Sequence, residues 1–211
     1  MEVELKYAIA DNETANSIWK DPYLKEIEEP DTRETVSMKG VYFDTEDHDF
    51  MKNDIALRVR KEGSRLVAAL KWNDASEGVF HRREEMNVAV TDEAQLEKPN
   101  LVVFEDSDIG KELIKLAGGK KLIKLMVVDV VRRRFRVEEN NTLMEISIDK
   151  GEIITENGNE PILEVEIELF SGDDSALLDL GNRLAEKYDL VIEKRSKYLR
   201  GITLLGVGAP E

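Results

Sequence analysis

The sequence predicts an α+β protein in which eight or so antiparallel strands form a closed or strongly curved sheet with a few helices around it. Most segments up to about residue 170 alternate charged and apolar residues with the period of two that is typical of strands. Short turn signals separate these segments, and helical spacing is clearest near the C-terminus. No linker or internal repeat interrupts the pattern, so we expect one domain over residues 1–211.

Alternation and intervening turns define the individual strands. In the first segment, Glu2, Glu4 and Lys6 alternate with Val3 and Leu5. We expect strands over residues 2–9, 38–45, 55–62, 65–72, 79–90, 127–138, 142–149 and 162–170. The strongest short turn signal is an Asn-Gly pair, which favours a tight hairpin. We expect turns at Gly63-Ser64, Asn140-Asn141, Lys150-Gly151 and Asn157-Gly158.

Helical segments lie between and after these strands. The clearest covers residues 173–188, where Leu177, Leu180, Leu184 and Tyr188 recur at helical spacing and predict a face packed on the core. We expect the remaining helices over residues 12–20, 22–28, 92–97 and 107–117, with a break at Pro22, a cap at Thr91 or Asp92, and an end at Gly118-Gly119.

The composition disfavours several classes of function. The chain has 30 Lys+Arg against 45 Asp+Glu, and this formal net charge of −15 disfavours nucleic acid and anionic membranes as partners. It has no cysteine and only two histidines, His48 and His81, which disfavours thiolate sites, His-based zinc sites and a Ser-His-Asp triad. No apolar run approaches the roughly 20 residues of a membrane span. The alternating start does not resemble a signal peptide, so we expect a cytoplasmic protein.

Charges of one sign share a face on several predicted strands. Arg58 and Arg60 form one basic pair, whereas Glu164, Glu166 and Glu168 form an acidic run. The pair Arg132 and Arg134 is basic, and the set Glu145, Ser147 and Asp149 is acidic or polar. Lys71 lies on a further face of this kind, and Arg83, Glu85 and Asn87 share a face that carries both signs. Such segregation by sign favours a shared interior over a solvated surface, with the apolar faces packed outward on the helices. Buried charges of this kind must be paired, hydrated or bound to a ligand.

This arrangement of charges predicts a site for a metal ion and a polyphosphate. Carboxylates on neighbouring strands suit Mg²⁺ or Mn²⁺, which prefer oxygen ligands, and clustered lysines and arginines suit phosphate. The sequence contains neither a Walker A loop nor a Gly-x-Gly-x-x-Gly fingerprint after a strand. Side chains must therefore hold the phosphates.

A series of motifs along nearly the whole chain resembles the CYTH superfamily, also called triphosphate tunnel metalloenzymes. The series begins with Glu2-x-Glu4-x-Lys6, which has the Glu-x-Glu-x-Lys form of the family signature. It continues with Tyr42-Phe43-Asp44-Thr45, Leu57-Arg58-Val59-Arg60, Leu70-Lys71, Arg83-x-Glu85, Arg132 with Phe135, Ile148-Asp149-x-Gly151, Glu164-x-Glu166-x-Glu168 and Ser196-Lys197-Tyr198-x-Arg200-Gly201. The stretch Pro161-Ile162-Leu163-Glu164 and the Ser-Lys-Tyr-x-Arg-Gly ending are most similar to the bacterial inorganic triphosphatase branch.

The resemblance implies a closed eight-stranded β-barrel tunnel with a charged lumen, and hydrolysis of a triphosphate with Mg²⁺ or Mn²⁺. It assigns metal binding to Glu2, Glu4, Glu164, Glu166 and, as a further candidate, Glu168. It assigns phosphate binding to Lys6, Arg58, Arg60, Lys71, Arg83, Arg132, Arg134, Lys197 and Arg200. Asp149 matches an acidic position linked to metal or water, and with Glu2, Glu4, Lys6, Glu164 and Glu166 it completes the expected catalytic set.

The chain departs from the family pattern at a few positions. Many members have a lysine two residues before the arginine matched by Arg132, where this chain has Val130, and Asn87 stands where many relatives have glutamate. The run from Arg132 to Arg134 leaves open which arginine faces inward. These departures affect individual roles and leave the site as a whole in place.

Three functions remain open at this stage. The first is an inorganic triphosphatase acting on a small polyphosphate. The second is an enzyme for an organic triphosphate: a nucleoside or thiamine triphosphatase, or an adenylate cyclase. The third, a polyphosphate-binding module without catalysis, is disfavoured by the retained acidic pairs. No aromatic stacking pair for a base is evident beside the charged strands, which favours the inorganic substrate. Whether the chain forms a homodimer is left open.

Overall fold

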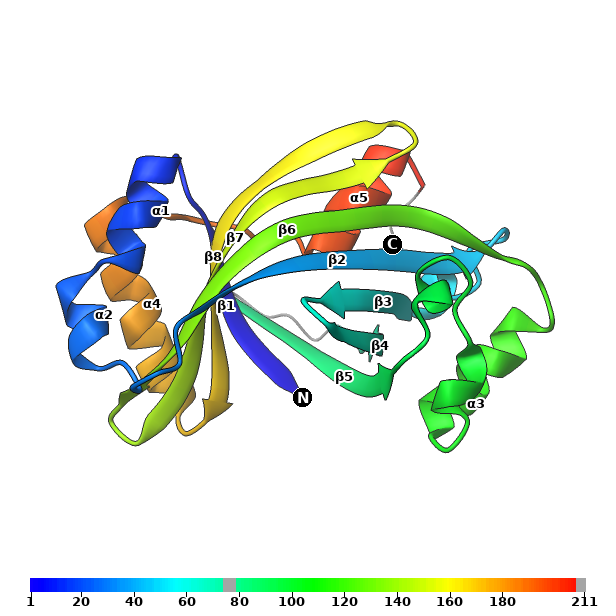
Figure 1. The fold of residues 1–211 in the computed structure, drawn as a ribbon, viewed down its shortest axis with the longest axis horizontal. Coiled ribbons are helices and arrows are strands. Elements are labelled where there is room, and N and C mark those ends of the chain that lie inside the picture. The colour runs from blue at the N-terminus through cyan, green and yellow to red at the C-terminus, as the bar shows by residue number, and fades with distance from the viewer. Residues whose placement is uncertain (74–78, 208–211) are drawn as a thin grey trace.

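Eight antiparallel strands close on themselves in the computed structural model, which describes residues 1–73 and 79–207 (Figure 1). Their order around the barrel is β5-β4-β3-β2-β6-β7-β8-β1, and pairing of β1 with β5 closes it. The strands are β1 (Glu2–Ala8), β2 (Glu34–Thr45), β3 (Ala56–Glu62), β4 (Arg65–Trp72), β5 (Phe80–Val90), β6 (Leu122–Glu139), β7 (Thr142–Thr155) and β8 (Gly158–Ser171). A two-residue strand, β9 (Val191–Ile192), extends β1 on one edge. The predicted fold class is confirmed.

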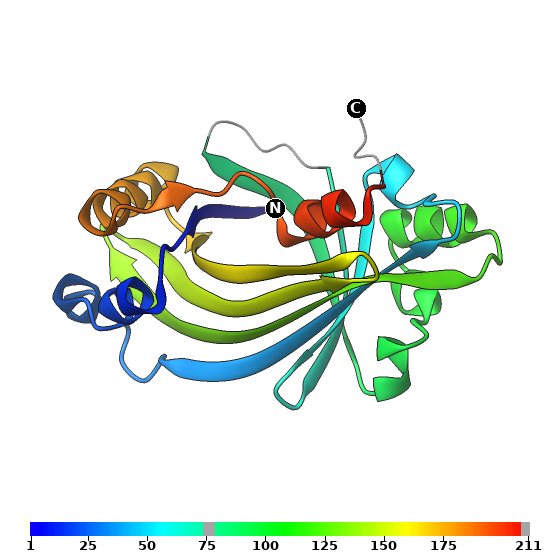
Figure 2. The same ribbon diagram turned by 90° about the horizontal axis from the view of Figure 1, so that it is seen from above.

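The apolar face of each strand points away from the barrel interior and packs on helices. At one end, α1 (Asn12–Trp19), α2 (Pro22–Glu26) and α4 (Asp174–Tyr188) cover strands β1 and β6–β8 (Figure 2). Ile18 of α1 and Leu177 of α4 are fully buried in this core. Asp11, Asp21 and Asp173 cap the three helices by accepting hydrogen bonds from backbone N–H groups.

A second apolar core covers the outer face of β2–β5. It contains Leu57, Val59 and Leu70 of the barrel together with Phe104 and Leu113 outside it. The covering elements are the 3₁₀ turns η1 (Met51–Asn53), η2 (Glu93–Leu96) and η3 (Leu101–Phe104) and helix α3 (Asp108–Ala117). The inward faces of the strands carry most of the charged residues, as the alternation predicted, together with a few apolar ones such as Met38 and Val130.

Helix α5 (Lys197–Leu205), which the sequence analysis did not predict, packs on β6, β7 and β8. Ile202 is buried in a third apolar core with Met126 and Val130 of β6. Gly201 permits this close packing, because a Cβ atom there would lie 2.1 Å from the sulfur of Met126. The helix begins at its cap Ser196, which accepts a hydrogen bond from the Leu199 N–H.

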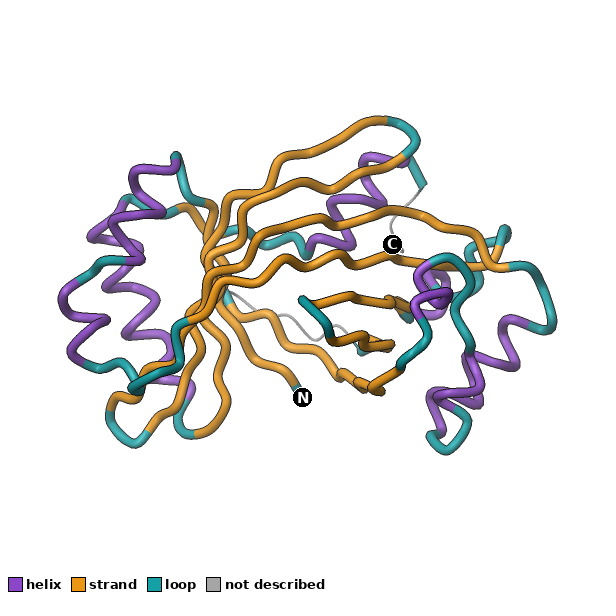
Figure 3. Tube along the Cα trace, viewed as in Figure 1, coloured by secondary structure: helices purple, strands orange, loops and turns teal. Residues whose placement is uncertain are grey.

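The expected boundaries hold best where a turn has a positive φ angle. Gly63 (φ 56°) separates β3 from β4, Asn140 and Asn141 (φ 52° and 57°) separate β6 from β7, and Gly158 follows the turn after β7 (Figure 3). The other predicted helices and 3₁₀ turns begin and end within two residues of their expected positions. None of the helices in the described ranges has the length and apolar character needed to cross a bilayer.

The turn expected at Lys150-Gly151 is wrong. Gly151 lies within β7, paired with Val130 on one side and Ile162 on the other. A Cβ atom there would lie 2.0 Å from the Asp129 carbonyl oxygen, so this glycine marks a close backbone approach within a strand. Strand β7 therefore continues past Gly151. Strands β2, β6 and β8 are also longer than the expected segments, and the inward faces of all four extend the charged interior.

Candidate functional site

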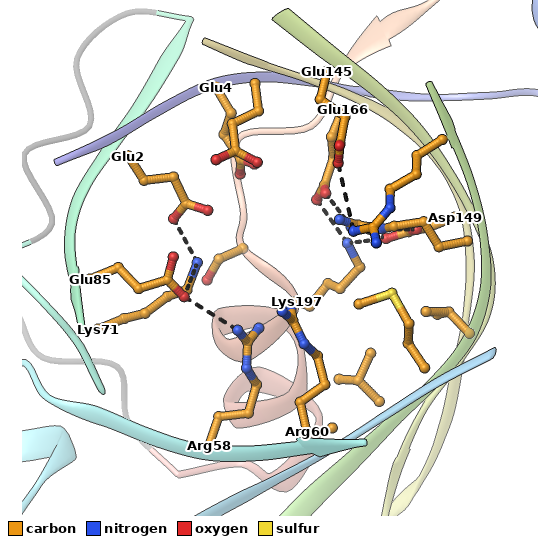
Figure 4. Close-up of a pocket in the computed structure, with 18 of the residues that line it drawn as sticks. Glu2, Glu4, Arg58, Arg60, Lys71, Glu85, Glu145, Asp149, Glu166 and Lys197 are labelled. Atoms are coloured by element: carbon orange, nitrogen blue, oxygen red, sulfur yellow. Dashed lines mark hydrogen bonds and ion pairs between the residues drawn. The ribbon is translucent and has the colours of Figure 1, made fainter. Parts of the chain in front are cut away.

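The barrel encloses a cavity of about 590 Å³, here called the lumen, whose walls are charged (Figure 4). Figure 4 shows Arg58 and Arg60 of β3 facing a group of carboxylates from β1, β7 and β8 across it. Most of the predicted site residues line the lumen: Glu2, Glu4, Lys6, Arg58, Arg60, Lys71, Arg83, Arg132, Arg134, Asp149, Glu166, Glu168 and Lys197. Val130 and Asn87, where the family pattern is broken, line it as well.

The structure resolves the run of three arginines on β6. Arg132 and Arg134 line the lumen. Arg133 points outward, where its guanidinium carbon lies 5.3 Å from the centre of the Trp19 ring. Strand periodicity requires this outcome, because neighbouring residues of a strand face opposite sides.

One part of the lumen holds a closed network of ion pairs. Arg132 donates two hydrogen bonds to Asp149, both of 2.7 Å, and a third of 2.6 Å to Glu166. Lys197 of α5 lies 2.8 Å from both Asp149 and Glu166. Burial alone would raise the pKa of Glu166, but Lys197 and Arg132 hold it well below its usual value. Both carboxylates are therefore ionised and already neutralised by cations.

Glu164 and Arg200 lie beside this network but do not line the lumen. Arg200 donates to Glu164 at 2.8 Å, to Glu160 at 2.7 Å and to the Pro161 carbonyl at 2.8 Å. Glu164 also pairs with Lys197. These contacts tie α5 to β8, so Arg200 is placed to position Lys197, and it does not reach the space where a substrate would bind.

Two groups of carboxylates are candidates for a divalent cation. Asp149, Glu164 and Glu166 each offer an oxygen within 4.8 Å of the other two. Arg132, Lys197 and Arg200 already pair with this group, so a metal ion bound here would compete with them for the carboxylates.

The second group surrounds Glu168, which among the described residues lacks the paired cations that Glu2 and Glu4 have in Lys71 and Lys6. Glu168 of β8 is in register with Glu4 of β1 on one side and with Glu145 of β7 on the other. Burial, followed by the charges of Glu2, Glu4 and Glu145, raises the pKa of Glu168 to about 8. Within residues 1–73 and 79–207, no hydrogen bond or ion pair reaches the Glu168 carboxylate. This donor set fits a hard cation, whose charge would relieve the repulsion.

The wall formed by β3 carries cations with unused donors. Arg58 lies 3.3 Å from Glu85, and in the part of the chain that the structure describes the Nε groups of both Arg58 and Arg60 are buried without a hydrogen-bond partner. Burial and the charge of Arg58 lower the pKa of Arg60 to about 10. A bound anion would satisfy these donors and reduce the repulsion between the two guanidinium groups.

Two lysines on neighbouring parts of the wall are paired with the acidic side. Lys71 lies 2.6 Å from Glu2, and Lys6 lies 3.2 Å from Glu4. Burial alone would lower the pKa of Lys6, but Glu4 and Glu166 raise it, so the ammonium group stays charged. Each lysine is therefore placed between the carboxylates and the open lumen.

Sequence reasoning missed an aromatic pair in the lumen. Tyr42 of β2 and Tyr198 of α5 both line it, with ring centres 5.4 Å apart. The expectation that no such pair lies beside the charged strands is therefore wrong. The inward position of Tyr42 could have been predicted, because Tyr42 lies two residues after the lumen-facing Gly40 and so points to the same side of β2. Tyr198 depends on helix α5, which no local periodicity had indicated.

Comparison with known proteins identifies similar sequences and folds. The chain matches the CYTH domain over residues 1–202. It is 29% identical over 170 residues to an inorganic triphosphatase from Haemophilus influenzae, an alignment that covers 78% of this chain and 45% of that protein. The chain thus spans about half the length of this relative.

Solved structures show the same fold at low sequence identity. A putative adenylyl cyclase from Hippeastrum, described as having a dominant triphosphatase activity, superposes with a TM-score of 0.69 at 17% identity, over 98% of this chain and 96% of that one. A putative adenylate cyclase from Bacillus halodurans superposes with a TM-score of 0.56 at 17% identity, over 93% and 94% of the two chains.

Proposed function

The chain belongs to the CYTH domain family, and from this premise we propose that it hydrolyses inorganic triphosphate to pyrophosphate and phosphate with the help of Mg²⁺ or Mn²⁺. The observation that supports this most strongly is the division of the lumen into two walls. Among the described residues, one wall offers the Nε donors of Arg58 and Arg60 without partners, and the other offers the Glu168 carboxyl group without a paired cation. A phosphate chain with its metal ion would satisfy both walls at once. The similarity to the Haemophilus triphosphatase points the same way.

We assign the metal ion to Glu2, Glu4 and Glu168, with Glu145 next to them. When bound, the ion would polarise the phosphoryl oxygens and neutralise charge that develops during P–O cleavage. Glu164 and Glu166, which the resemblance assigned to the metal, are better placed to hold Lys197 and Arg132. Asp149 fixes the orientation of Arg132 through two hydrogen bonds.

We assign the phosphate groups mainly to Arg58, Arg60 and Lys71, with Lys6 and Arg132 across the lumen. Their charges would stabilise the oxygens of the transition state without having to reorient, because the ion pairs already hold the side chains in place. Arg83, Arg134 and Lys197 line the same lumen and would add positive potential around the chain of phosphates. Water bound among these groups would be the attacking nucleophile.

Processing of an organic triphosphate is the second candidate, and the tyrosine pair favours it. A base or another flat ring attached to the triphosphate could stack on Tyr42 or Tyr198, which lie beside Arg58 and Lys197. The inorganic substrate remains the better fit, because charged groups outnumber aromatic ones along the lumen. A nucleoside or thiamine group would leave some of these cations unpaired.

The deciding experiment measures phosphate release from inorganic triphosphate, ATP and thiamine triphosphate, each with and without Mg²⁺ or Mn²⁺. We expect kcat/KM for inorganic triphosphate to exceed that for ATP by about two orders of magnitude, since unpaired buried cations cost a few kcal/mol. Equal kcat/KM values would favour the organic alternative, and formation of cyclic AMP would identify a cyclase. Full activity after chelation of all divalent metal would contradict the metal assignment.

A further inference from the structure

Beyond Arg60, the inward face of β3 ends in a carboxylate. Glu62 follows Arg60 at the next position on this face and is almost fully buried. It contacts three guanidinium groups: Arg134 at 2.6 Å, Arg65 at 2.8 Å and Arg60 at 3.2 Å. The charges of Arg60 and Arg134 outweigh the effect of burial and lower the pKa of Glu62, so it is an anion at neutral pH.

Glu62 does not line the lumen itself but lies behind Arg60, Arg65 and Arg134, which line it between its centre and its open mouth. The exposed fraction of the arginine side chains rises from 14% at Arg58 to 22% at Arg60 and 68% at Arg65. At the opposite side, Lys197 and Tyr198 of α5 line the lumen, and Figure 4 shows α5 behind the charged ring. A phosphate chain longer than the central site can hold must therefore extend past Glu62.

Space does not prevent that extension. The lumen continues beyond Glu62, where Asp31, Thr32, Glu34 and Arg65 line it. The charges there are already balanced, because Arg134 pairs with Glu34 as well as with Glu62. A further phosphate would meet fixed carboxylates beside arginines that are mostly paired already, which is unfavourable in a partly desolvated site.

We propose that Glu62 is a specificity-determining residue that limits the substrate to short polyphosphates by occupying, with its own carboxylate, the arginine cluster a fourth phosphate would need. The inference rests on the proposed function. It predicts that removing this charge, while keeping the shape of the side chain, turns Arg60, Arg65 and Arg134 into an additional phosphate site.

The test is the Glu62→Gln variant of the full chain. Apparent affinities for inorganic triphosphate and tetraphosphate are measured by thermal-shift titration, and turnover of both is measured separately with Mg²⁺. We expect the affinity for tetraphosphate, relative to triphosphate, to rise about tenfold, the value of one charged hydrogen bond. The ratio of the two kcat/KM values should change in the same direction. Glu28→Gln is the matched control, because the arginine paired with Glu28, Arg33, does not line the lumen, whereas the three arginines paired with Glu62 do.

A second variant, Arg65→Gln, serves if Glu62→Gln does not fold. Arg65 is largely exposed, so its replacement should be tolerated. Loss of this cation should weaken tetraphosphate binding more than triphosphate binding. If the unmodified chain binds neither compound, the proposed function fails. If it binds both and neither variant changes their relative affinity, the role of Glu62 alone is overturned.

Discussion

Glu168 is a carboxyl group whose ionisation the metal-free barrel does not compensate. Its pKa of about 8 lies above its ordinary value of 4.5, so the folded chain keeps a proton that the unfolded chain has lost. Raising the pH through this interval therefore favours unfolding. In EDTA-treated protein, we expect the free energy of unfolding to fall between about pH 5 and pH 8, and Glu168→Gln to flatten that slope. Urea denaturation at a series of pH values measures the free energy of unfolding and its slope against pH.

Glu156→Gln is the matched control for this measurement, since Glu156 is exposed in the turn before β8. It should retain the pH slope of the unmodified chain. Added Mg²⁺ should also flatten the slope, because a cation among Glu2, Glu4 and Glu168 keeps all three ionised. The same slope in the unmodified chain and in Glu168→Gln would contradict the placement of Glu168 in an uncompensated group.

Arg60 lines the lumen, and within the described residues its Nε group is buried without a hydrogen-bond partner. We expect Arg60→Gln to lower kcat/KM for inorganic triphosphate about 100-fold, the usual effect of losing one fixed donor to a transition state. Arg133→Gln, on the outward face of β6, should change kcat/KM little. Steady-state phosphate release measures both. Similar losses in the two variants would show that the inward position of Arg60 has no special role.

The sequence predicted which side chains share the lumen better than it predicted how they pair. Successive side chains of a strand point to opposite faces, so the direction of each side chain is a local property. Once the strand is known, Arg132 and Arg133 must therefore face opposite sides of the barrel wall. Pairing depends on contacts between distant segments. Glu164, Glu166 and Glu168 have the same parity, yet cations from α5 neutralise the first two and not the third.

Helix α5 shows the corresponding limit for secondary structure. Its cap Ser196 and its terminating Gly206 are present in the sequence, but the helix has nine residues and contains a glycine. Short helices are stabilised mainly by tertiary packing, here between Ile202 and the core that contains Met126 and Val130. The turn expected at Gly151 failed for the same reason, because the close approach of Asp129 that requires glycine is a tertiary contact.

Arg200 joins α5 to β8, and its loss should affect both stability and activity. Arg200→Gln would leave Glu164 buried with fewer partners, and removal of one member of a buried ion pair typically costs about 3 kcal/mol. We expect a lower urea midpoint and a lower kcat, since Lys197 lies one turn earlier on the same helix. Arg195→Gln, which breaks a half-exposed pair with Glu193, should cost less than about 1 kcal/mol. Equal destabilisation by Arg200→Gln and Arg195→Gln would contradict the proposal that Arg200 anchors α5 to β8.

The barrel as a unit keeps a strongly charged interior inside a chain of net charge −15. Without a ligand, Arg58 and Arg60 repel each other, and the carboxylates around Glu168 do the same on the opposite wall. A ligand that binds only the folded chain raises stability by about 2.7 kcal/mol at 100 times its Kd. The structure therefore predicts that inorganic triphosphate stabilises the protein against heat, and that Mg²⁺ adds to the effect.

Differential scanning calorimetry with triphosphate, pyrophosphate and sulfate at equal ionic strength tests this prediction. Triphosphate should raise the Tm most, because it places the most negative charge against the lumen-facing arginines and lysines, and sulfate should raise it least. Arg60→Gln should reduce the rise with triphosphate, whereas Arg133→Gln, on the outer face, should preserve it. If millimolar triphosphate shifts the Tm no more than sulfate does, the charged lumen does not recognise a phosphate chain. The proposed reaction would then have to be abandoned together with it.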